Sequence, residues 1–405
     1  MGVRTDELER VEGGVTAPKG FRAAGIHCGI KSGKKDLALI VSESVASAAA
    51  MFTTNAVKAA PVVVSQERVQ SGAAQAIIVN SGNANACSGA QGRRDAREMG
   101  MLTAQALGIA EEFVLVASTG VIGVLLPMTT IRQGIPLLAQ RLSTDATDAA
   151  EAILTTDAFP KTMAVQFEIA GKTVTIGGMA KGAGMIHPQM ATTLCFLTTD
   201  AAIPAAGLRA ALRMAIHRSF NCISVDGDTS TNDSVFLLAN GMAGHPPMTD
   251  EDEVFDRFRD ALTKVATELA KMVVRDGEGA TKLVAITVQG ARSSRDAKLA
   301  VTAIVTSPLV KTALYGAEPN WGRLMAALGR SGATLREDHV QISIAGIPVV
   351  HRGVSASRDL SAAAAAMRTP EFDIVIDLQQ GEASFTCWTC DLTDAYVKVN
   401  AGSMT

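Results

Sequence analysis

The sequence has few aromatic residues and little net charge. Its 405 residues include 2 Trp, 2 Tyr and 12 Phe, so aromatics make up only 4% of the chain. A core of this size must therefore be filled mostly by Ala, Val, Leu, Ile and Met side chains. The formal net charge of -3 lacks the basic excess that is typical of nucleic-acid-binding proteins. We therefore expect no nucleic-acid partner.

Long apolar runs are also missing, and we expect no leader segment. No stretch approaches the roughly 18 consecutive apolar residues of a membrane span. The opening residues, MGVRTDELERVEGG, are polar and charged, unlike a secretory signal. We therefore expect a cytoplasmic protein with no membrane partner.

The cysteines are few and scattered, which favours reduced thiols in a chain without a leader. They are Cys28, Cys87, Cys195, Cys222, Cys387 and Cys390. The last two form a CxxC, but a second pair is missing, so we expect no four-cysteine zinc site. The apolar alternation around them predicts a strand, on which the two thiols point to opposite faces.

Strand and helix patterns alternate along the chain, which predicts an α/β fold. The expected strands are short apolar runs bounded by turn residues: Leu37–Val41, Ala76–Val79, Phe113–Ala117, Lys282–Val288, Val340–Ile344 and Phe372–Leu378. The expected helices are longer and amphipathic: Ala90–Leu107, Thr130–Ser143, Ala205–Ser219, Glu251–Val274, Arg295–Thr306 and Asn320–Leu328. The loop Gly244-His245-Pro246-Pro247 predicts the edge of a smaller subdomain from about residue 245 onward.

Two loops of small residues follow expected strands, at Asn80–Ala86 and at Ser118–Gly123. Neither contains GxGxxG or GxxxxGK[ST], so neither is a known phosphate cradle. Small residues after a strand can still point backbone N–H groups at a ligand.

The most unusual segment spans residues 177–194, where four glycines and a proline follow an expected strand at Lys172–Ile176. The spacing alone favours a tight turn between two core strands. The alternative is a threonine nucleophile at Thr192, just ahead of the apolar run Leu194–Leu197. An internal threonine is a poor nucleophile. Cutting the Ala191–Thr192 bond would free an α-amino group, of pKa about 7.7–8.0, to act as its base.

The run KGAGMIHPQMAT (Lys181–Thr192) resembles the cleavage-site motif of the ornithine acetyltransferase family. These proteins are the bifunctional or monofunctional glutamate N-acetyltransferases of arginine biosynthesis. Further segments resemble the family in the same order: Val79–Cys87, Ala117–Gly123, Thr155–Asp157, Ser224–Asp233, Asp276–Lys282, Ser307–Ala313, Pro319–Arg323 and Trp388–Leu392. The resemblance thus covers essentially the full chain.

The resemblance implies that the precursor cuts itself between Ala191 and Thr192. The products would be an α chain of residues 1–191 and a β chain of residues 192–405, associated as an α2β2 heterotetramer. The implied fold is the four-layered αββα sandwich of certain self-cleaving aminopeptidases, with a smaller C-terminal α/β domain.

The resemblance also implies the chemistry. Thr192 would take the acetyl group of N-acetylornithine and pass it to glutamate through an acetyl ester, which is a ping-pong transfer. Thr119 and Gly120 would form the oxyanion hole. The implied substrate contacts are Lys181, Thr192, Glu278, Asn400, Thr405 and one of Thr155 and Thr156, a choice that the sequence leaves open. The tail lacks the family's Tyr-Thr-Thr ending. No metal and no resident cofactor are expected, and the use of acetyl-CoA as a second donor stays open.

Two other functions and two other candidate sites compete with this interpretation. A self-cleaving amidase or aminopeptidase of the same fold would pass the acyl group to water, and a non-catalytic protein would keep the fold uncut. His187 lies five residues before Thr192, but we expect no catalytic role for it. Asp226, Asp228 and Asp233 lack the calcium-loop spacing, so we interpret them as a structural loop near the active site.

Overall fold

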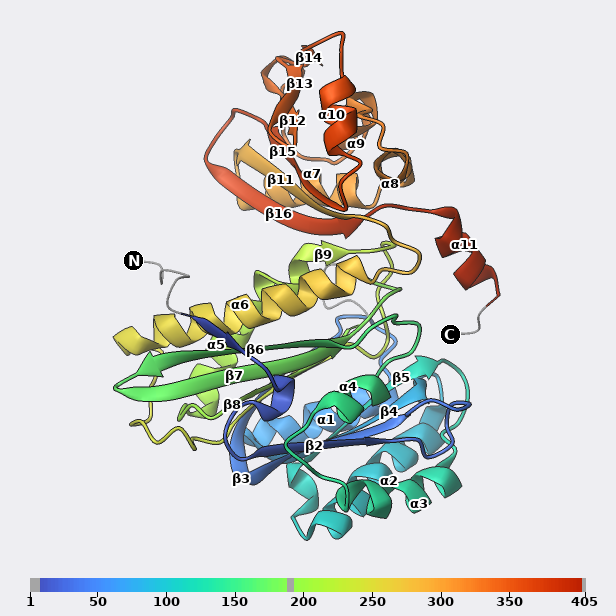
Figure 1. Cartoon of the computed structure of the whole chain (residues 1–405), viewed down its shortest axis with the longest axis vertical. Coiled ribbons are helices and arrows are strands. Elements are labelled where there is room, and N and C mark those ends of the chain that lie inside the picture. The colour runs from blue at the N-terminus through green and yellow to red at the C-terminus, as the bar shows by residue number, and fades with distance from the viewer. Residues whose placement is uncertain (1–7, 188–192, 403–405) are drawn as a thin grey trace.

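The computed structural model describes residues 8–187 and 193–402, and these residues form two β-sheets with helices packed on them (Figure 1). The strands of the larger sheet are β1 (Glu9–Val11), β2 (Phe21–Ile26), β3 (Leu37–Phe52), β4 (Ala73–Asn83), β5 (Val114–Val121), β6 (Lys161–Ile169), β7 (Lys172–Lys181), β8 (Leu194–Thr199) and β10 (Ser234–Ala239). The strands of the smaller sheet are β9 (Ile223–Ser224), β11 (Leu283–Ala291), β12 (Gln341–Ile344), β13 (Ile347–His351), β14 (Val354–Ser355), β15 (Glu371–Asp377) and β16 (Ala383–Cys390).

The helices interleave with these strands along the chain. They are α1 (Ala60–Arg68), α2 (Gly89–Leu107), α3 (Met128–Ala139), α4 (Thr147–Ala152), α5 (Ala205–His217), α6 (Glu253–Arg275), α7 (Ser294–Val305), α8 (Pro308–Tyr315), α9 (Trp321–Gly329), α10 (Ser361–Ala366) and α11 (Asp394–Ala401). No single helix of the described chain is long and apolar enough to cross a membrane, although the bent pair α7–α8 passes the same test of length and composition.

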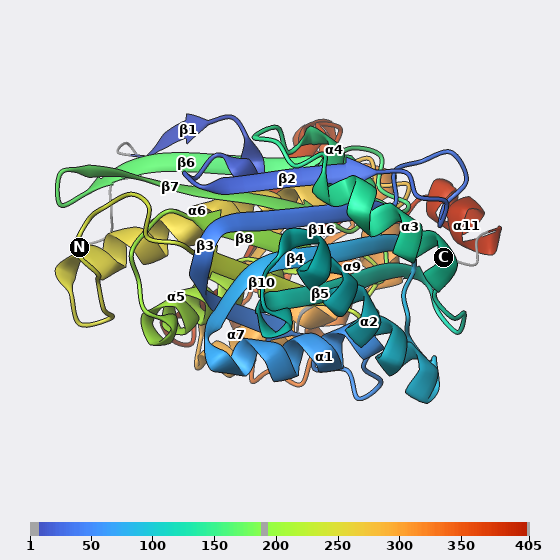
Figure 2. The same ribbon diagram turned by 90° about the horizontal axis from the view of Figure 1, so that it is seen from below.

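Strand β3 turns the larger sheet into two layers. It runs for 16 residues, and its register shifts between Val41 and Ala46. The part before the shift pairs with β2 and β4. The part after it keeps two pairs with β4, at Ala46 and Ser47, and pairs with β10 from Ser47 to Phe52. The layer β2–β3–β4–β5 therefore faces the layer β6–β7–β8–β10, as Figures 1 and 2 show.

The alternation of apolar side chains explains why this sheet is covered on every face. Ile40 and Ile77 of one layer meet Phe196 and Phe236 of the other, and the two phenylalanine rings stack at 5.8 Å. The opposite face of β8 and β10 packs on α5 and α6, and the opposite face of β3–β5 packs on α1, α2 and α3. These four layers confirm the αββα sandwich expected from the sequence.

The smaller sheet forms the second domain and is covered by α7, α8, α9 and α10. Helix α6 packs on β6 and β7 of the sandwich, and apart from the short β9 the strands of the smaller sheet follow from Leu283 onward. The subdomain edge expected near residue 245 stays a prediction. Cys387 and Cys390 lie on β16 as predicted, and their side chains enter two different cores. Burial raises the pKa of both thiols, so neither is poised for redox or metal chemistry.

Each predicted strand and helix named above occurs in the structure, and most bounds agree within a few residues. The exception is Leu37–Val41, because β3 continues from there to Phe52. The loop predicted from Gly177 onward begins later, because β7 continues to Lys181. Gly177 is needed for packing rather than for a turn, since a Cβ there would lie 1.9 Å from the carbonyl oxygen of Gly14.

Candidate active site

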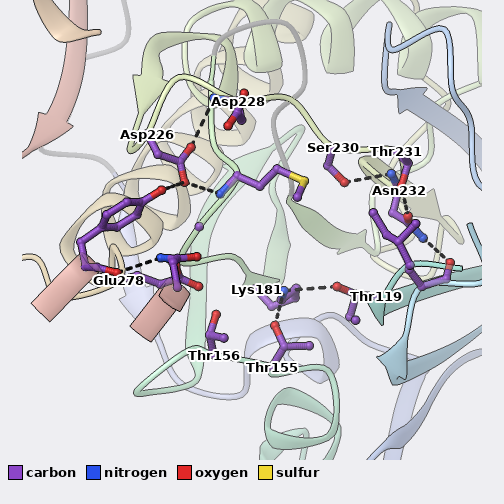
Figure 3. A pocket seen from close by; sticks show the side chains of 17 residues that line it. Thr119, Thr155, Thr156, Lys181, Asp226, Asp228, Ser230, Thr231, Asn232 and Glu278 are labelled. Atoms are coloured by element: carbon purple, nitrogen blue, oxygen red, sulfur yellow. Dashed lines mark hydrogen bonds between the residues drawn. The ribbon is translucent and has the colours of Figure 1, made fainter. Parts of the chain in front are cut away.

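A cavity of about 360 Å³ opens where β5 and β7 end, beside the loop after α4 and helix α11 (Figure 3). The structure brings together around it seven of the residues that the sequence singled out: Thr119, Gly120, Thr155, Thr156, Lys181, Glu278 and Asn400. Ala191, Thr192 and Thr405 lie outside the described residues. Their roles, like those of the seven, stay predictions at this point.

Lys181 is the buried cation of this cavity. It is the last residue of β7, and its Nζ donates to Thr155 Oγ1 at 2.7 Å and to Thr119 Oγ1 at 3.2 Å (Figure 3). Burial lowers the pKa of Lys181, and the nearby Asp157 carboxylate opposes that effect. Asp157 favours the ammonium form of Lys181, and in that form the side chain can hold a carboxylate or a polarised carbonyl oxygen.

A chain of buried charges lies behind Lys181. Asp157 accepts from Lys161 Nζ at 2.7 Å and from the Gly182 N–H at 2.7 Å, and it lies 3.8 Å from Lys181 Nζ. Lys161 also donates to Asp276 at 2.6 Å. Burial alone would raise the pKa of Asp157, but Lys181 and Lys161 hold it well below its usual range. The fixed carboxylate thus sets the position of the Lys181 ammonium.

Sequence reasoning assigned no role to Lys161 or Asp276. The sequence did contain one clue to Lys161, because this lysine is the first residue of the apolar strand β6. A lysine that is fully buried, as Lys161 is, needs a carboxylate partner. The sequence does not show which carboxylate that is, since Asp276 lies 115 residues away along the chain.

The conformation of the Thr119-Gly120 loop requires a glycine at position 120. Gly120 has φ 132°, and a Cβ there would lie 2.3 Å from the carbonyl carbon of Gly82. The ends of β4 and β5 therefore approach too closely for any side chain at this position. Asn232 fixes the same strand ends, since its Nδ2 donates to the carbonyls of Ala84 at 2.6 Å and Ser118 at 2.8 Å.

Replacing Gly120 by alanine tests this loop. We expect the acetyl transfer predicted from the sequence to fall about a hundredfold, because the displaced loop would misplace the predicted oxyanion donors. Steady-state kcat is the measurement. Gly123→Ala is the matched control, since Gly123 also has a positive φ but a Cβ there meets nothing within 4 Å. Equal losses of kcat in the two variants would contradict the specific requirement for glycine at position 120.

The opposite wall of the cavity is acidic. The Glu278 carboxylate accepts from Asn400 Nδ2 of α11 at 2.7 Å. It lies against Gly184, where a Cβ would come within 2.6 Å of it. Tyr396, also on α11, donates its hydroxyl to Asp226 at 3.3 Å. Helix α11 buries none of its side chains, so these polar contacts tie it to the cavity.

The loop of residues 226–232 contributes further lining that the sequence placed only near the site: Asp226, Asp228, Ser230, Thr231 and Asn232. His187 lies outside this lining and its Nδ1 contacts Ser224 Oγ at 3.3 Å. Within the described residues, no cluster of three or more His, Cys, Asp or Glu side chains could hold a metal ion.

Comparison with known proteins places this chain in a family. The model of the ArgJ family matches residues 22–405. The arginine biosynthesis bifunctional protein ArgJ of Symbiobacterium thermophilum is 52% identical over 402 residues, covering 98% of this chain and 100% of that protein. The protein of the same name from Caldanaerobacter subterraneus is 48% identical, covering 98% of this chain and 100% of that protein.

Among solved structures, the ornithine acetyltransferase of Mycobacterium tuberculosis in complex with ornithine is 41% identical to this chain. The match covers 45% of this chain and 98% of the solved one, with a TM-score of 0.42. The family match and the identities above confirm the resemblance first drawn from Lys181–Thr192. This chain belongs to the ArgJ family.

Proposed function

We propose that this protein is a glutamate N-acetyltransferase of arginine biosynthesis that moves an acetyl group from N2-acetylornithine to glutamate. The observation that carries the proposal is the pairing of a buried ammonium, Lys181, with a carboxylate, Glu278, in one cavity beside the Thr119-Gly120 loop. An acyltransferase of arginine biosynthesis agrees with the names of the relatives.

Thr192 is the proposed nucleophile, freed by cleavage of the Ala191–Thr192 bond. Its hydroxyl oxygen adds to the acetyl carbonyl carbon, and its α-amino group takes the hydroxyl proton. The bond to the ornithine nitrogen then breaks, that nitrogen takes the proton, and an acetyl ester is left on Thr192. The amino group of glutamate attacks the ester in the second half-reaction and restores the threonine.

The oxyanion formed in each half-reaction needs donors that are already in place. We assign that role to Thr119 and Gly120, whose loop is locked against Gly82. Lys181 supports the same loop through Thr119 Oγ1, and its buried charge favours a negative substrate group.

The two amino-acid substrates differ in their side chains, and the proposed contacts reflect this. Glu278 pairs with the side-chain ammonium of the ornithine moiety, assisted by Asn400. Thr155 and Thr156 line the cavity next to Lys181, where an α-carboxylate would bind. Thr405 belongs to the same proposal, although it lies outside the described residues.

A Glu278→Gln variant tests the ammonium contact. Glutamine keeps an oxygen that can accept from Asn400 but loses the charge, so we expect KM for N-acetylornithine to rise about tenfold. The matched measurement is the reverse half-reaction with N-acetylglutamate, which has no side-chain ammonium and should change little. Equal KM changes for the two donors would remove Glu278 from this role.

Direct assay distinguishes the proposed function from its rivals. Transfer of labelled acetyl from N-acetylornithine to glutamate supports it, whereas rapid acetate release without glutamate would favour an amidase of the same fold.

Because the relatives are named bifunctional, we also propose acetyl-CoA as a second donor. An α2β2 assembly of the cleaved chains is part of the proposal, and native mass spectrometry tests it.

A further inference from the structure

The loop of residues 224–234 holds the chain on both sides of the segment 188–192. On the upstream side, Asp226 accepts from the Met185 N–H at 2.6 Å and from the Ile186 N–H at 2.9 Å. The Ile186 carbonyl in turn accepts from the Val225 N–H at 2.8 Å. Met185 has φ 59°, so the chain takes a left-handed turn where this aspartate binds it.

On the downstream side, Asp233 performs the same task. Its Oδ1 accepts from the Thr193 N–H at 2.9 Å, and the Thr193 carbonyl accepts from the Ser234 N–H at 3.1 Å. Asp233 is only 1% exposed, and its Oδ2 has no hydrogen-bond partner within the described parts of the chain. Such a carboxyl is costly to bury, so its contact with Thr193 calls for an explanation beyond packing.

We propose that Asp226 and Asp233 are positioning residues for self-cleavage. They fix the two ends of the segment that contains the Ala191–Thr192 bond, so this inference rests on the proposed function. In the cleavage, the Thr192 hydroxyl oxygen adds to the Ala191 carbonyl carbon and the bond to the Thr192 nitrogen breaks. The hydroxyl proton passes to that nitrogen, and water then hydrolyses the ester.

Fixed ends favour this reaction for a geometric reason. The hydroxyl must approach the carbonyl of the residue before it, which an unrestrained chain does only in rare conformations. Asp226 and Asp233 contact the residues that flank the segment, Met185, Ile186 and Thr193, and so fix where its two ends lie. The same loop carries Asn232, which donates to the carbonyls of Ala84 and Ser118, so one loop contacts both the flanks of the segment and the strand ends beside Thr119-Gly120.

The test compares Asp233→Leu with Asp233→Asn in the full chain. Leucine cannot accept from the Thr193 N–H, so we expect the half-time of cleavage to lengthen at least about tenfold. Asparagine keeps one acceptor oxygen and should rescue the rate to within about threefold of the wild type. Asp226→Leu should slow cleavage as Asp233→Leu does. In the cleaved chains, Asp233→Leu should lower kcat and leave KM for N-acetylornithine unchanged.

Asp200→Leu is the matched control. Asp200 is also buried and accepts from two backbone N–H groups, those of Lys19 and Thr175, but it follows the far end of β8. We expect it to lower the melting temperature as Asp233→Leu does while cleavage stays normal. Wild-type cleavage rates in Asp233→Leu and Asp226→Leu, or equal slowing in Asp200→Leu, would overturn the positioning role. A wild-type chain that is never cut would instead overturn the proposed function.

Discussion

Replacing Thr192 by alanine should leave a single uncut chain of 42.1 kDa and lower acetyl transfer at least about 10⁴-fold. Both effects have one cause in the proposed mechanism, in which the same hydroxyl attacks the Ala191 carbonyl during maturation and the acetyl carbonyl during turnover. Removing a nucleophile abolishes the covalent route, and only binding and the oxyanion loop remain. The measurements are a denaturing gel of the purified protein and the rate of acetyl transfer to glutamate.

Thr192→Ser is the matched control, because serine keeps a hydroxyl at the same position. We expect it to be cut more slowly than the wild type and to retain measurable transfer. An alanine variant that is still cut at residue 191, or that still transfers acetyl at the wild-type rate, would eliminate Thr192 as the nucleophile.

Replacing Lys161 by methionine should destabilise the protein by about 3–5 kcal/mol, the usual result of removing one partner from a buried ion pair. Lys161 is fully buried and joins Asp157 to Asp276, so its loss leaves two carboxylates without their shared cation. Methionine fills nearly the same volume as lysine, so the loss of stability should come from the missing charge and not from a cavity. Urea unfolding measured at pH 7 gives the free energy.

Lys35→Met is the control for this change. Lys35 also joins two carboxylates, those of Asp148 and Glu151, but its side chain is 32% exposed. We expect it to lose less than about 1 kcal/mol, as exposed ion pairs do. Similar losses of unfolding free energy in the two variants would show that burial does not strengthen the Lys161 ion pairs.

The same network predicts an acid dependence of stability. Asp157 has a folded-state pKa well below the ordinary carboxyl value of about 3.9, so its contribution is complete above that value and is lost as the pH falls. In Lys161→Met the folded-state pKa of Asp157 should rise towards its unfolded value, so acidification should cost the variant less stability than it costs the wild type. Melting temperatures recorded from pH 7 down to pH 3 test the shift, and parallel curves would contradict it.

Much of the fold could be predicted because its pattern is local. The helix Glu251–Val274 and the strand Phe372–Leu378 have periodic apolar faces, and both occur within about three residues of the prediction. The bend in β3 could not be predicted, because the shift at Val41–Ala46 is set by its pairing with both β4 and β10. Helix α1 was missed since its apolar stretch, Ala60–Arg68, is short.

The site divides in the same way. Lys181, Thr119 and Glu278 could be proposed from motifs, and the structure places all three at one cavity. The pairing of Lys161 with Asp276 and of Tyr396 with Asp226 joins residues more than 100 positions apart, which no spacing rule reveals. The hold of Asp233 on Thr193 depends likewise on the parallel pairing of β8 with β10.

The most direct test of the account is intact-mass spectrometry of the purified wild-type protein, before and after addition of N-acetylornithine. Scaling 42.1 kDa by chain length, we predict pieces of about 20 and about 22 kDa, the heavier beginning at Thr192. After the donor is added, the heavier piece alone should gain the mass of one acetyl group. A single unmodified species of 42.1 kDa would contradict both the self-cleavage and the acetyl-threonine intermediate.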